Sequence, residues 1–249
     1  MSDRRDPSDF PEIEDESDER LWQLIDALKD GEPGIRSAAA WTLGKGARGI
    51  TPAIEALTEA LGDPIAEVRK SAAAALGEMG DEARDAALAL AERLGDADAS
   101  VRMVAADALG EIGPGAEAAL PFLRPALADG DLLVALHVRY AIARITGDAR
   151  DHLSVFIAAL THADHHIRSA SAWCLERIGP PAAPAVPALV AALGDGHWYV
   201  RLSAAEALGL IGRAAACAIP KLQAMQGDPN KDVRKVAAGA IEDIRNSEQ

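Results

Sequence analysis

The chain has 249 residues, of which 49% are hydrophobic but only 4% aromatic, and its formal net charge is −14. Because much of the apolar content is Ala, close helix packing is favoured over a β-sandwich, which needs β-branched and aromatic residues. The acidic balance disfavours binding to nucleic acid or an anionic membrane, and two cysteines fit a reducing compartment. We therefore expect a soluble, all-α protein of the cytoplasm.

The N-terminal segment is acidic and poor in apolar residues. Residues 1–20 contain nine carboxylates and three arginines, so this stretch cannot bury enough surface to order itself. We predict a disordered tail over residues 1–16 and a repeat domain over residues 17–249. In a sharper alternative, the motif Phe10-Pro11-x-Ile13 docks on a partner or in the protein's own groove.

A repeat of 33 residues runs through the rest of the chain. Six of its seven units carry a Val or Ile followed by Arg, and Val134-Ala135 holds this place in unit four. The marker pairs are Ile35-Arg36, Val68-Arg69, Val101-Arg102, Ile167-Arg168, Val200-Arg201 and Val233-Arg234. A leucine series with the same spacing precedes them: Leu24, Leu57, Leu90, Leu123, Phe156 (in place of Leu), Leu189 and Leu222.

Each unit is therefore predicted to be a helix A, a short turn and a helix B. Gly-Asp pairs such as 62–63 and 194–195 mark the turn, where Gly suits the left-handed end of helix A. Asp suits the N-cap of helix B, and Pro64 and Pro229 follow it at the first helical position. One helix pair cannot bury its own apolar face, so the pairs must stack into an α-solenoid (an α-α superhelix) of about seven hairpins.

The pattern Asp-x4-Val-Arg-x2-Ala-Ala-x-Ala-Leu-Gly-x-Ile-Gly stands at residues 63–80, 96–113 and 195–212. It resembles the HEAT repeat, in particular the HEAT-like variant named for phycobilisome lyases, over roughly residues 17–245. In that family, the turn Asp and the helix B Arg support each other along the stack. The matching pairs here are Asp30/Arg36, Asp63/Arg69, Asp96/Arg102, Asp195/Arg201 and Asp228/Arg234.

Units four and five depart from this pattern. Ala135 replaces Arg and Ala143 replaces Gly in unit four, and Glu176 replaces Gly in unit five. We expect the ladder of Asp and Arg to be weakest there, and the arc to bend or loosen.

The resemblance implies that helix B lines the concave surface. Counting the marker Val or Ile as position 1, positions 3, 4, 7 and 11 point away from the buried face, at about 100° per residue. Trp41, Tyr140 and Trp173 all occupy position 7, a clustering that indicates a binding surface in a chain so poor in aromatics. In the alternative interpretation, superhelical twist tucks position 7 between adjacent helices, where an aromatic ring only fills a gap.

The predicted partner-binding residues come from the groove positions and from the start of helix B in unit six. They are Trp41, Met103, Leu136, His137, Tyr140, Arg144, Trp173, Arg177, Trp198, Tyr199 and Leu202. Of these, Arg144 and Arg177 are placed to grip a carboxylate of the partner.

No catalytic, cofactor-binding or metal-binding residue is predicted. His162, Asp164, His165 and His166 cluster in the turn of unit five, but we expect them to be solvated turn residues. Cys174 replaces a buried Ala, which suits a small hydrophobe better than a nucleophile. HEAT-like DNA glycosylases need a cationic groove, whereas the groove positions here mix both signs of charge.

The function favoured by these features is a non-enzymatic protein–protein interaction scaffold. Its partner is a protein or peptide held in the concave groove, without a cofactor. One alternative is a lyase or chaperone-like subunit acting on a chromophore- or cofactor-bearing protein, which the family resemblance suggests. Another is a metalloenzyme that uses the histidines of unit five.

Overall fold

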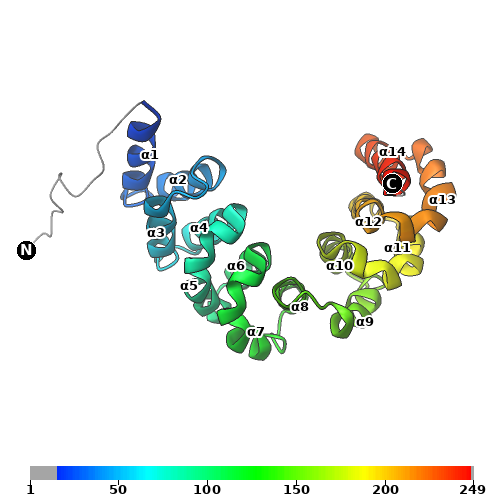
Figure 1. The fold of residues 1–249 in the computed structure, drawn as a ribbon, viewed down its shortest axis with the longest axis horizontal. Helices are drawn as coiled ribbons and strands as arrows, with labels where there is room; N and C mark the ends of the chain where they lie inside the picture. The colour runs from blue at the N-terminus through cyan, green and yellow to red at the C-terminus, as the bar shows by residue number, and fades with distance from the viewer. Residues whose placement is uncertain (1–15, 248–249) are drawn as a thin grey trace, which may run out of the picture.

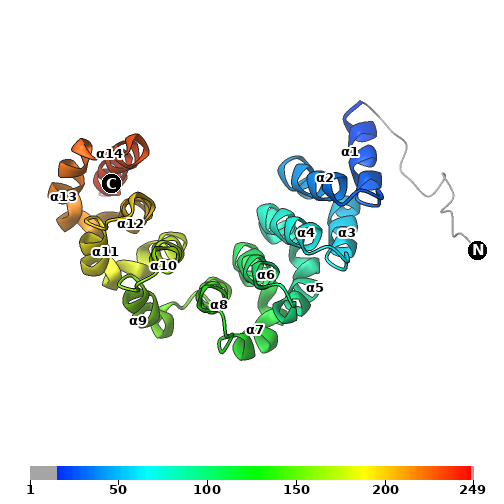
Figure 2. The same cartoon turned by 180° about the vertical axis from the view of Figure 1, so that it is seen from behind.

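The structure is a computed structural model that describes residues 16–247. All regular secondary structure in that range is helical, and the helices alternate between two layers of an open arc, seen from its two sides in Figure 1 and Figure 2. The α-solenoid predicted from the repeat is thus confirmed. The first helix begins at Glu16, the last residue of the predicted tail. The rest of that tail, with its Phe10-Pro11-x-Ile13 motif, lies outside the described residues.

The inner, concave layer consists of the second helix of each unit (Figure 1). These helices are α2 (Pro33–Gly46), α4 (Ala66–Met79), α6 (Ala99–Ile112), α8 (Leu132–Thr146), α10 (His165–Ile178), α12 (Trp198–Ile211) and α14 (Lys231–Asn246). The marker Val or Ile is buried in units two to seven, whereas Ile35 of unit one is exposed. Because the second helices lie on the inside of the arc in Figure 1, the prediction that helix B lines the concave face is confirmed.

The outer layer contains the first helix of each unit. These helices are α1 (Glu16–Ala27), α3 (Thr51–Ala60), α5 (Ala87–Glu92), α7 (Leu120–Ala126), α9 (Arg150–Ala159), α11 (Val186–Ala192) and α13 (Ile219–Ala224). Short 3-10 segments adjoin several of them: η2 (Gly80–Ala86), η3 (Arg93–Gly95), η4 (Gly113–Ala119), η5 (Pro180–Ala185), η6 (Gly212–Ala218) and η7 (Met225–Gly227).

The turns differ from the prediction in two respects. The N-cap of α4 is Ile65 rather than Asp63, and the carboxylate of Asp63 instead accepts a hydrogen bond from the Ile65 N–H at 2.8 Å. Pro64 therefore precedes the helix. Glycines with positive φ, such as Gly80 (63°) and Gly212 (74°), end the inner helices and not the outer ones. Glycine adopts a positive φ without steric cost, which suits it to these positions at the ends of the inner helices.

Within residues 16–247, five bidentate ion pairs join successive units. An Arg of one inner helix donates to the turn Asp of the next unit, with N···O distances of 2.6–3.0 Å, in the pairs Arg36–Asp63, Arg69–Asp96, Arg102–Asp129, Arg168–Asp195 and Arg201–Asp228. Within its own unit, the guanidinium binds only backbone carbonyls, as Arg69 does with Asp63 O at 2.9 Å and Pro64 O at 3.1 Å. The carboxylate partner thus comes from the next unit, which corrects the pairs taken from the family resemblance. Hydrogen bonds from these arginines lower the pKa of the turn aspartates.

This ladder is interrupted between units four and five. Ala135 lies at the place of the Arg, and His162 lies at the place of the Asp. The buried core also divides there, because α8 contributes Val138 to one apolar cluster and Leu136 to another. The predicted weak point of the ladder therefore coincides with the boundary between two cores.

The stretch Trp198–Gly227 is long and apolar enough to cross a membrane, judged by length and composition alone. In the structure it is not one straight helix, because the chain reverses at Gly212 between α12 and α13. Val200, Leu208 and Leu222 of this stretch are fully buried in the solenoid. Packing between the two layers accounts for its hydropathy.

Candidate binding site on the concave face

A cavity of about 570 Å³ opens on the concave side and is lined by α4, α6 and α10. Residues with little or no side chain line part of it, namely Ala74, Gly77, Gly80 and Ala108. Its charged and aromatic lining consists of Arg48, Glu78, Asp107, Glu111, Trp173 and Arg177. The space is open because the small residues of α4 and α6 do not fill it.

Glycines bring the inner helices of this region close together. A Cβ atom at Gly77 would lie 2.9 Å from Cα of Ala108, closer than real Cβ contacts. At Gly110 it would lie 2.5 Å from Cε1 of Tyr140 and 3.2 Å from Cα of Ala141. Glycine at position 110 therefore makes the room that the Tyr140 ring occupies.

Glu111 of α6 is the centre of a polar network that reaches two further helices. Tyr140 of α8 donates its hydroxyl to Glu111 Oε1 at 2.6 Å, and Arg177 of α10 donates Nε to the same oxygen at 3.0 Å. Arg177 Nη2 pairs with the second carboxylate oxygen. Burial alone would raise the pKa of Glu111, but the hydrogen bonds from Arg177 and Tyr140 outweigh it and leave that pKa below its usual value. Burial and the bond to Glu111 raise the pKa of Tyr140.

A second polar pair lies one turn away. His137 of α8 is bonded to Asp107 of α6 through Nδ1, and only 7% of His137 is exposed. Burial raises the pKa of Asp107, and the interaction with His137 only partly offsets that rise. Two titratable groups of α8 are thus matched with two carboxylates of α6.

Trp173 of α10 packs against the α8 member of both polar pairs. Its ring stacks on His137 and meets Tyr140 edge to face, with centroid distances of 5.2 Å in each case. The guanidinium of Arg177 lies 5.9 Å from the centre of the Trp173 ring, within cation–π range. These contacts link units three, four and five across the interruption in the ladder.

A family model of HEAT repeats matches residues 21–95, 54–143 and 183–242, which together cover most of the sequence. The chain belongs to the HEAT-repeat family. A model of the PBS lyase HEAT-like repeat matches residues 167–195 of this HEAT-repeat protein, in agreement with the resemblance drawn from its sequence motifs. None of the curated proteins compared with it matches its sequence.

Several solved structures are similar to this HEAT-repeat protein. The complex of CpcE and CpcF of phycocyanin lyase from Nostoc sp. PCC7120 is 24% identical, with a TM-score of 0.64 and coverage of 98% of this chain and 100% of that chain. Human deoxyhypusine hydroxylase in complex with glycerol is 24% identical, with a TM-score of 0.47 and coverage of 92% and 97%. A designed armadillo repeat protein in complex with peptide (KR)4 is 21% identical, with a TM-score of 0.45 and coverage of 90% and 99%. At these identities, the likeness concerns the fold alone.

The HEAT-repeat structure distributes the predicted binding residues over three environments. Leu136 and Tyr140 are fully buried and His137 is nearly so, which corrects the expectation that they are exposed in the groove. Position 7 of unit four lies between inner helices because Gly110 leaves space there. The half-buried group is Met103, Trp173 and Leu202, and the exposed group is Trp41, Arg144, Arg177, Trp198 and Tyr199.

Arg177 has a different partner from the one expected. The sequence predicts that it grips a carboxylate of the binding partner, whereas in the structure it is bonded to Glu111 of the same chain. Asp107 and Glu111 were not among the predicted binding residues. They occupy groove positions 7 and 11 of unit three, but nothing in their spacing indicates bonds to units four and five.

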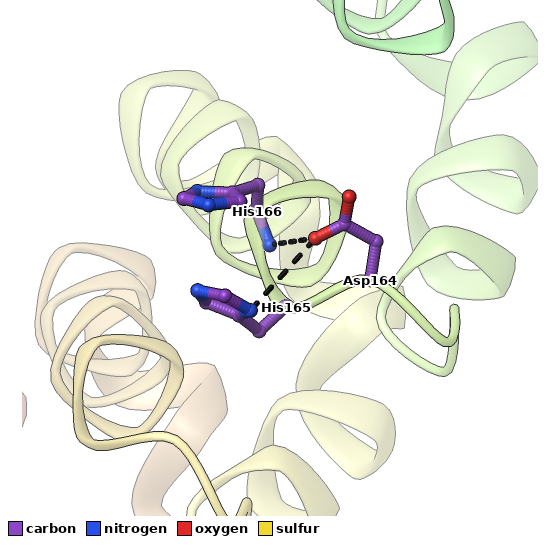
Figure 3. Close-up of side chains that lie close together, drawn as sticks. All are labelled: Asp164, His165 and His166. Carbon is purple, nitrogen blue, oxygen red and sulfur yellow. Dashed lines mark hydrogen bonds and ion pairs between the residues drawn. The ribbon is translucent and has the colours of Figure 1, made fainter.

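The remaining candidates for chemistry are a cysteine and a cluster of histidines, and neither belongs to the polar network around Glu111. Cys174 is fully buried, and burial raises the pKa of its thiol well above the usual value, so it is a poor nucleophile. In the described part of the chain, the donor atoms of Asp164, His165 and His166 are close enough to hold a metal ion (Figure 3). They lie at the start of α10, away from the cavity lining.

Proposed function

We propose that this HEAT-repeat protein is a non-enzymatic interaction scaffold of the cytoplasm that holds a peptide, or a segment of a partner protein, in its concave groove. The observation that carries the proposal is the cavity of about 570 Å³ between α4, α6 and α10. Apolar Ala74 and the half-exposed face of Trp173 supply contact area there, and charged side chains supply orientation.

The proposed occupant is a net basic segment. The chain carries a net charge of −14, and the lining of the cavity contains three carboxylates but two guanidinium groups. Long-range attraction therefore speeds the approach of a cationic partner and repels an anionic one. The Trp173 ring adds a surface on which a Lys or Arg side chain of the partner can lie.

An obstructing substitution tests the proposal without disturbing the core. Ala74 is exposed and lines the cavity, so Ala74→Arg places a long cationic side chain where the segment should bind. Peptides selected by display on the wild-type protein should be net basic, and Ala74→Arg should weaken their binding by at least about tenfold, the equivalent of 1.4 kcal/mol. Fluorescence anisotropy of the selected peptides measures this loss.

Ala191→Arg is the matched control, because Ala191 is an exposed alanine of the outer helix α11. It adds the same charge and should leave peptide affinity unchanged. Far-UV circular dichroism should show equal helicity for all three proteins. Failure of the wild type to enrich any peptide, or equal losses in both variants, would overturn binding in the groove.

A further inference from the structure

A row of neighbouring aromatic rings joins units five and six at the edge where α10 and α12 begin. The centroids of His166 and His165 are 4.1 Å apart, those of His165 and His197 are 3.9 Å apart, and His197 stacks on Trp198 at 6.2 Å. Tyr199 meets Trp198 edge to face at 5.4 Å. None of these five residues lines the concave cavity.

The backbone of the histidines is held in place by two turn carboxylates. Asp164 caps α10 by accepting a hydrogen bond from the His166 N–H at 2.8 Å, and Asp195 accepts one from the His197 N–H at 2.8 Å. Asp195 is itself fixed by the bidentate pair with Arg168. The imidazoles therefore extend from ordered turns, which reduces the entropy that a ligand must remove on binding.

The donor atoms available in this row are suited to a metal ion. Those of Asp164, His165 and His166 all lie within 4.8 Å of one another, and Figure 3 shows the two imidazoles side by side at the start of α10. In the described structure, Nδ1 of His197 is buried and has no hydrogen-bond partner. A buried nitrogen without a partner is unfavourable, so an ion that accepts its lone pair is favoured.

We propose that His165, His166 and His197, together with the carboxylate of Asp164, bind a divalent transition metal ion of the zinc class. Imidazole nitrogen is a preferred ligand of Zn²⁺, Cu²⁺ and Ni²⁺, whereas Ca²⁺ and Mg²⁺ require mainly oxygen ligands. Three imidazoles and one carboxylate are the four ligands that a tetrahedral site needs, and the His197 ring must turn toward the donor atoms of Asp164, His165 and His166 to complete it.

The ion bridges two repeat units, because His165 and His166 belong to α10 whereas His197 immediately precedes α12. It reinforces the joint that already holds the Arg168–Asp195 pair. The neighbouring joint between units four and five lacks the ladder ion pair, because Ala135 and His162 hold the places of its Arg and Asp. The site is structural and independent of peptide binding in the concave groove.

Calorimetric titration of the full chain with Zn²⁺ tests the bridge. The wild type should bind one ion per chain, and His165→Gln and His197→Gln should each weaken binding by at least about tenfold. His152→Gln is the matched control, because His152 is a half-buried histidine of α9 outside the row. Its affinity for Zn²⁺ should equal that of the wild type.

Two outcomes of the titration overturn the proposal. If His197→Gln binds Zn²⁺ as tightly as the wild type, the ion sits on the adjacent histidines of α10 alone and does not bridge the units. If the wild type binds no more tightly than a His165→Gln, His197→Gln double variant, there is no site in this row. Circular dichroism distinguishes either result from a failure to fold.

Fluorescence quenching locates the ion independently. The ring of Trp198 lies beside that of His197, so paramagnetic Cu²⁺ bound there should quench Trp198 strongly. Trp198→Phe should abolish most of the quenching while its Zn²⁺ affinity stays within about twofold of the wild type. Quenching that persists in Trp198→Phe would place the ion near another tryptophan and contradict the proposed site.

Discussion

Units two and three differ from units four and five in how their inner helices meet. In unit two, Gly77 lets α4 contact the backbone of α6, and Arg69 adds a bidentate pair to Asp96 of the next turn. In units four and five the equivalent glycine positions hold Ala143 and Glu176. The ion pair between those two units is missing as well. The joint between units four and five thus lacks both contacts that hold unit two to unit three.

Side chains replace the missing contacts in the irregular part. His137, Tyr140 and Trp173 form an aromatic cluster there. His137 and Tyr140 of this cluster are bonded to carboxylates of α6. The concave cavity opens beside this cluster. The comparison teaches that departures from the repeat, rather than the repeat itself, mark the region that carries a polar and aromatic network.

Removing one regular ion pair should have the largest effect. Arg69→Ala leaves the carboxylate of Asp96 unpaired although its side chain is only 5% exposed. We expect a loss of about 3 kcal/mol of unfolding free energy, because an uncompensated buried charge is costly. Urea unfolding followed by circular dichroism measures it.

Lys70→Ala is the control for this prediction, because it removes an ion pair of the same helix that is solvent-exposed. Lys70 pairs with Glu67 at 2.6 Å, and the two side chains are 34% and 61% exposed. Its loss should stay within about 0.5 kcal/mol. Equal effects of the two substitutions would show that the buried ladder does not stabilise the regular units.

Replacing a glycine at a close helix contact should have the next largest effect on the free energy of unfolding. In Gly77→Ala the new methyl group must push α4 and α6 apart, since Cα of Ala108 would lie 2.9 Å away. We expect a loss of about 2 kcal/mol despite the better helix propensity of Ala. Thermal unfolding of the variant measures it.

Gly239→Ala in α14 should change the free energy of unfolding in the opposite direction. Nothing lies within 4 Å of a Cβ at that position, so only helix propensity changes. This variant should gain up to about 1 kcal/mol. If Gly77→Ala were stabilised as well, the close backbone contact of α4 and α6 would not hold in solution.

The layers of the arc could be predicted from the sequence, but the polar network could not. A buried residue such as Val68 or Leu76 at each repeat fixes which face of a helix packs, so periodicity alone identifies the inner layer. The burial of Tyr140 depends on the missing side chain of Gly110 in the preceding inner helix. Likewise, Glu111 and Arg177 lie two repeat units apart in the sequence and meet only because of the curvature of the solenoid. Such contacts require the superhelical geometry, which the repeat spacing does not specify.

Restoring the missing ion pair would make the irregular joint resemble its neighbours. In the Ala135→Arg, His162→Asp double variant, both partners of the ladder are present between units four and five. We expect a gain of about 1 kcal/mol, with each single substitution neutral or unfavourable because its charge has no partner. A double-mutant cycle in urea measures the coupling. Strictly additive effects would mean that the helices of units four and five are too far apart for the pair to form.

The smallest expected effect concerns the carboxylate at the glycine position of unit five. Burial raises the pKa of Glu176 to about 7, and nearby Glu206 adds to the rise while Arg177 opposes it. In the unfolded chain the pKa is about 4.3, so the folded state holds this proton more tightly. Stability should therefore fall as pH rises from about 4.3 to about 7 and stay low above that range.

Glu176→Gln removes this titration and should be more stable than the wild type at pH 8 but equal to it at pH 4. The side chain is partly exposed, so solvent screening keeps the gain below about 1 kcal/mol. Urea midpoints at both pH values measure the difference, with Glu242→Gln, an exposed carboxylate of α14, as the control for net charge. A gain that is independent of pH, or that Glu242→Gln reproduces, would attribute it to total charge. A gain that grows as pH rises from about 4.3 to about 7, and that only Glu176→Gln shows, would mean that the Glu176 carboxylate lowers the stability of the joint between α10 and α12, where the regular units have glycine.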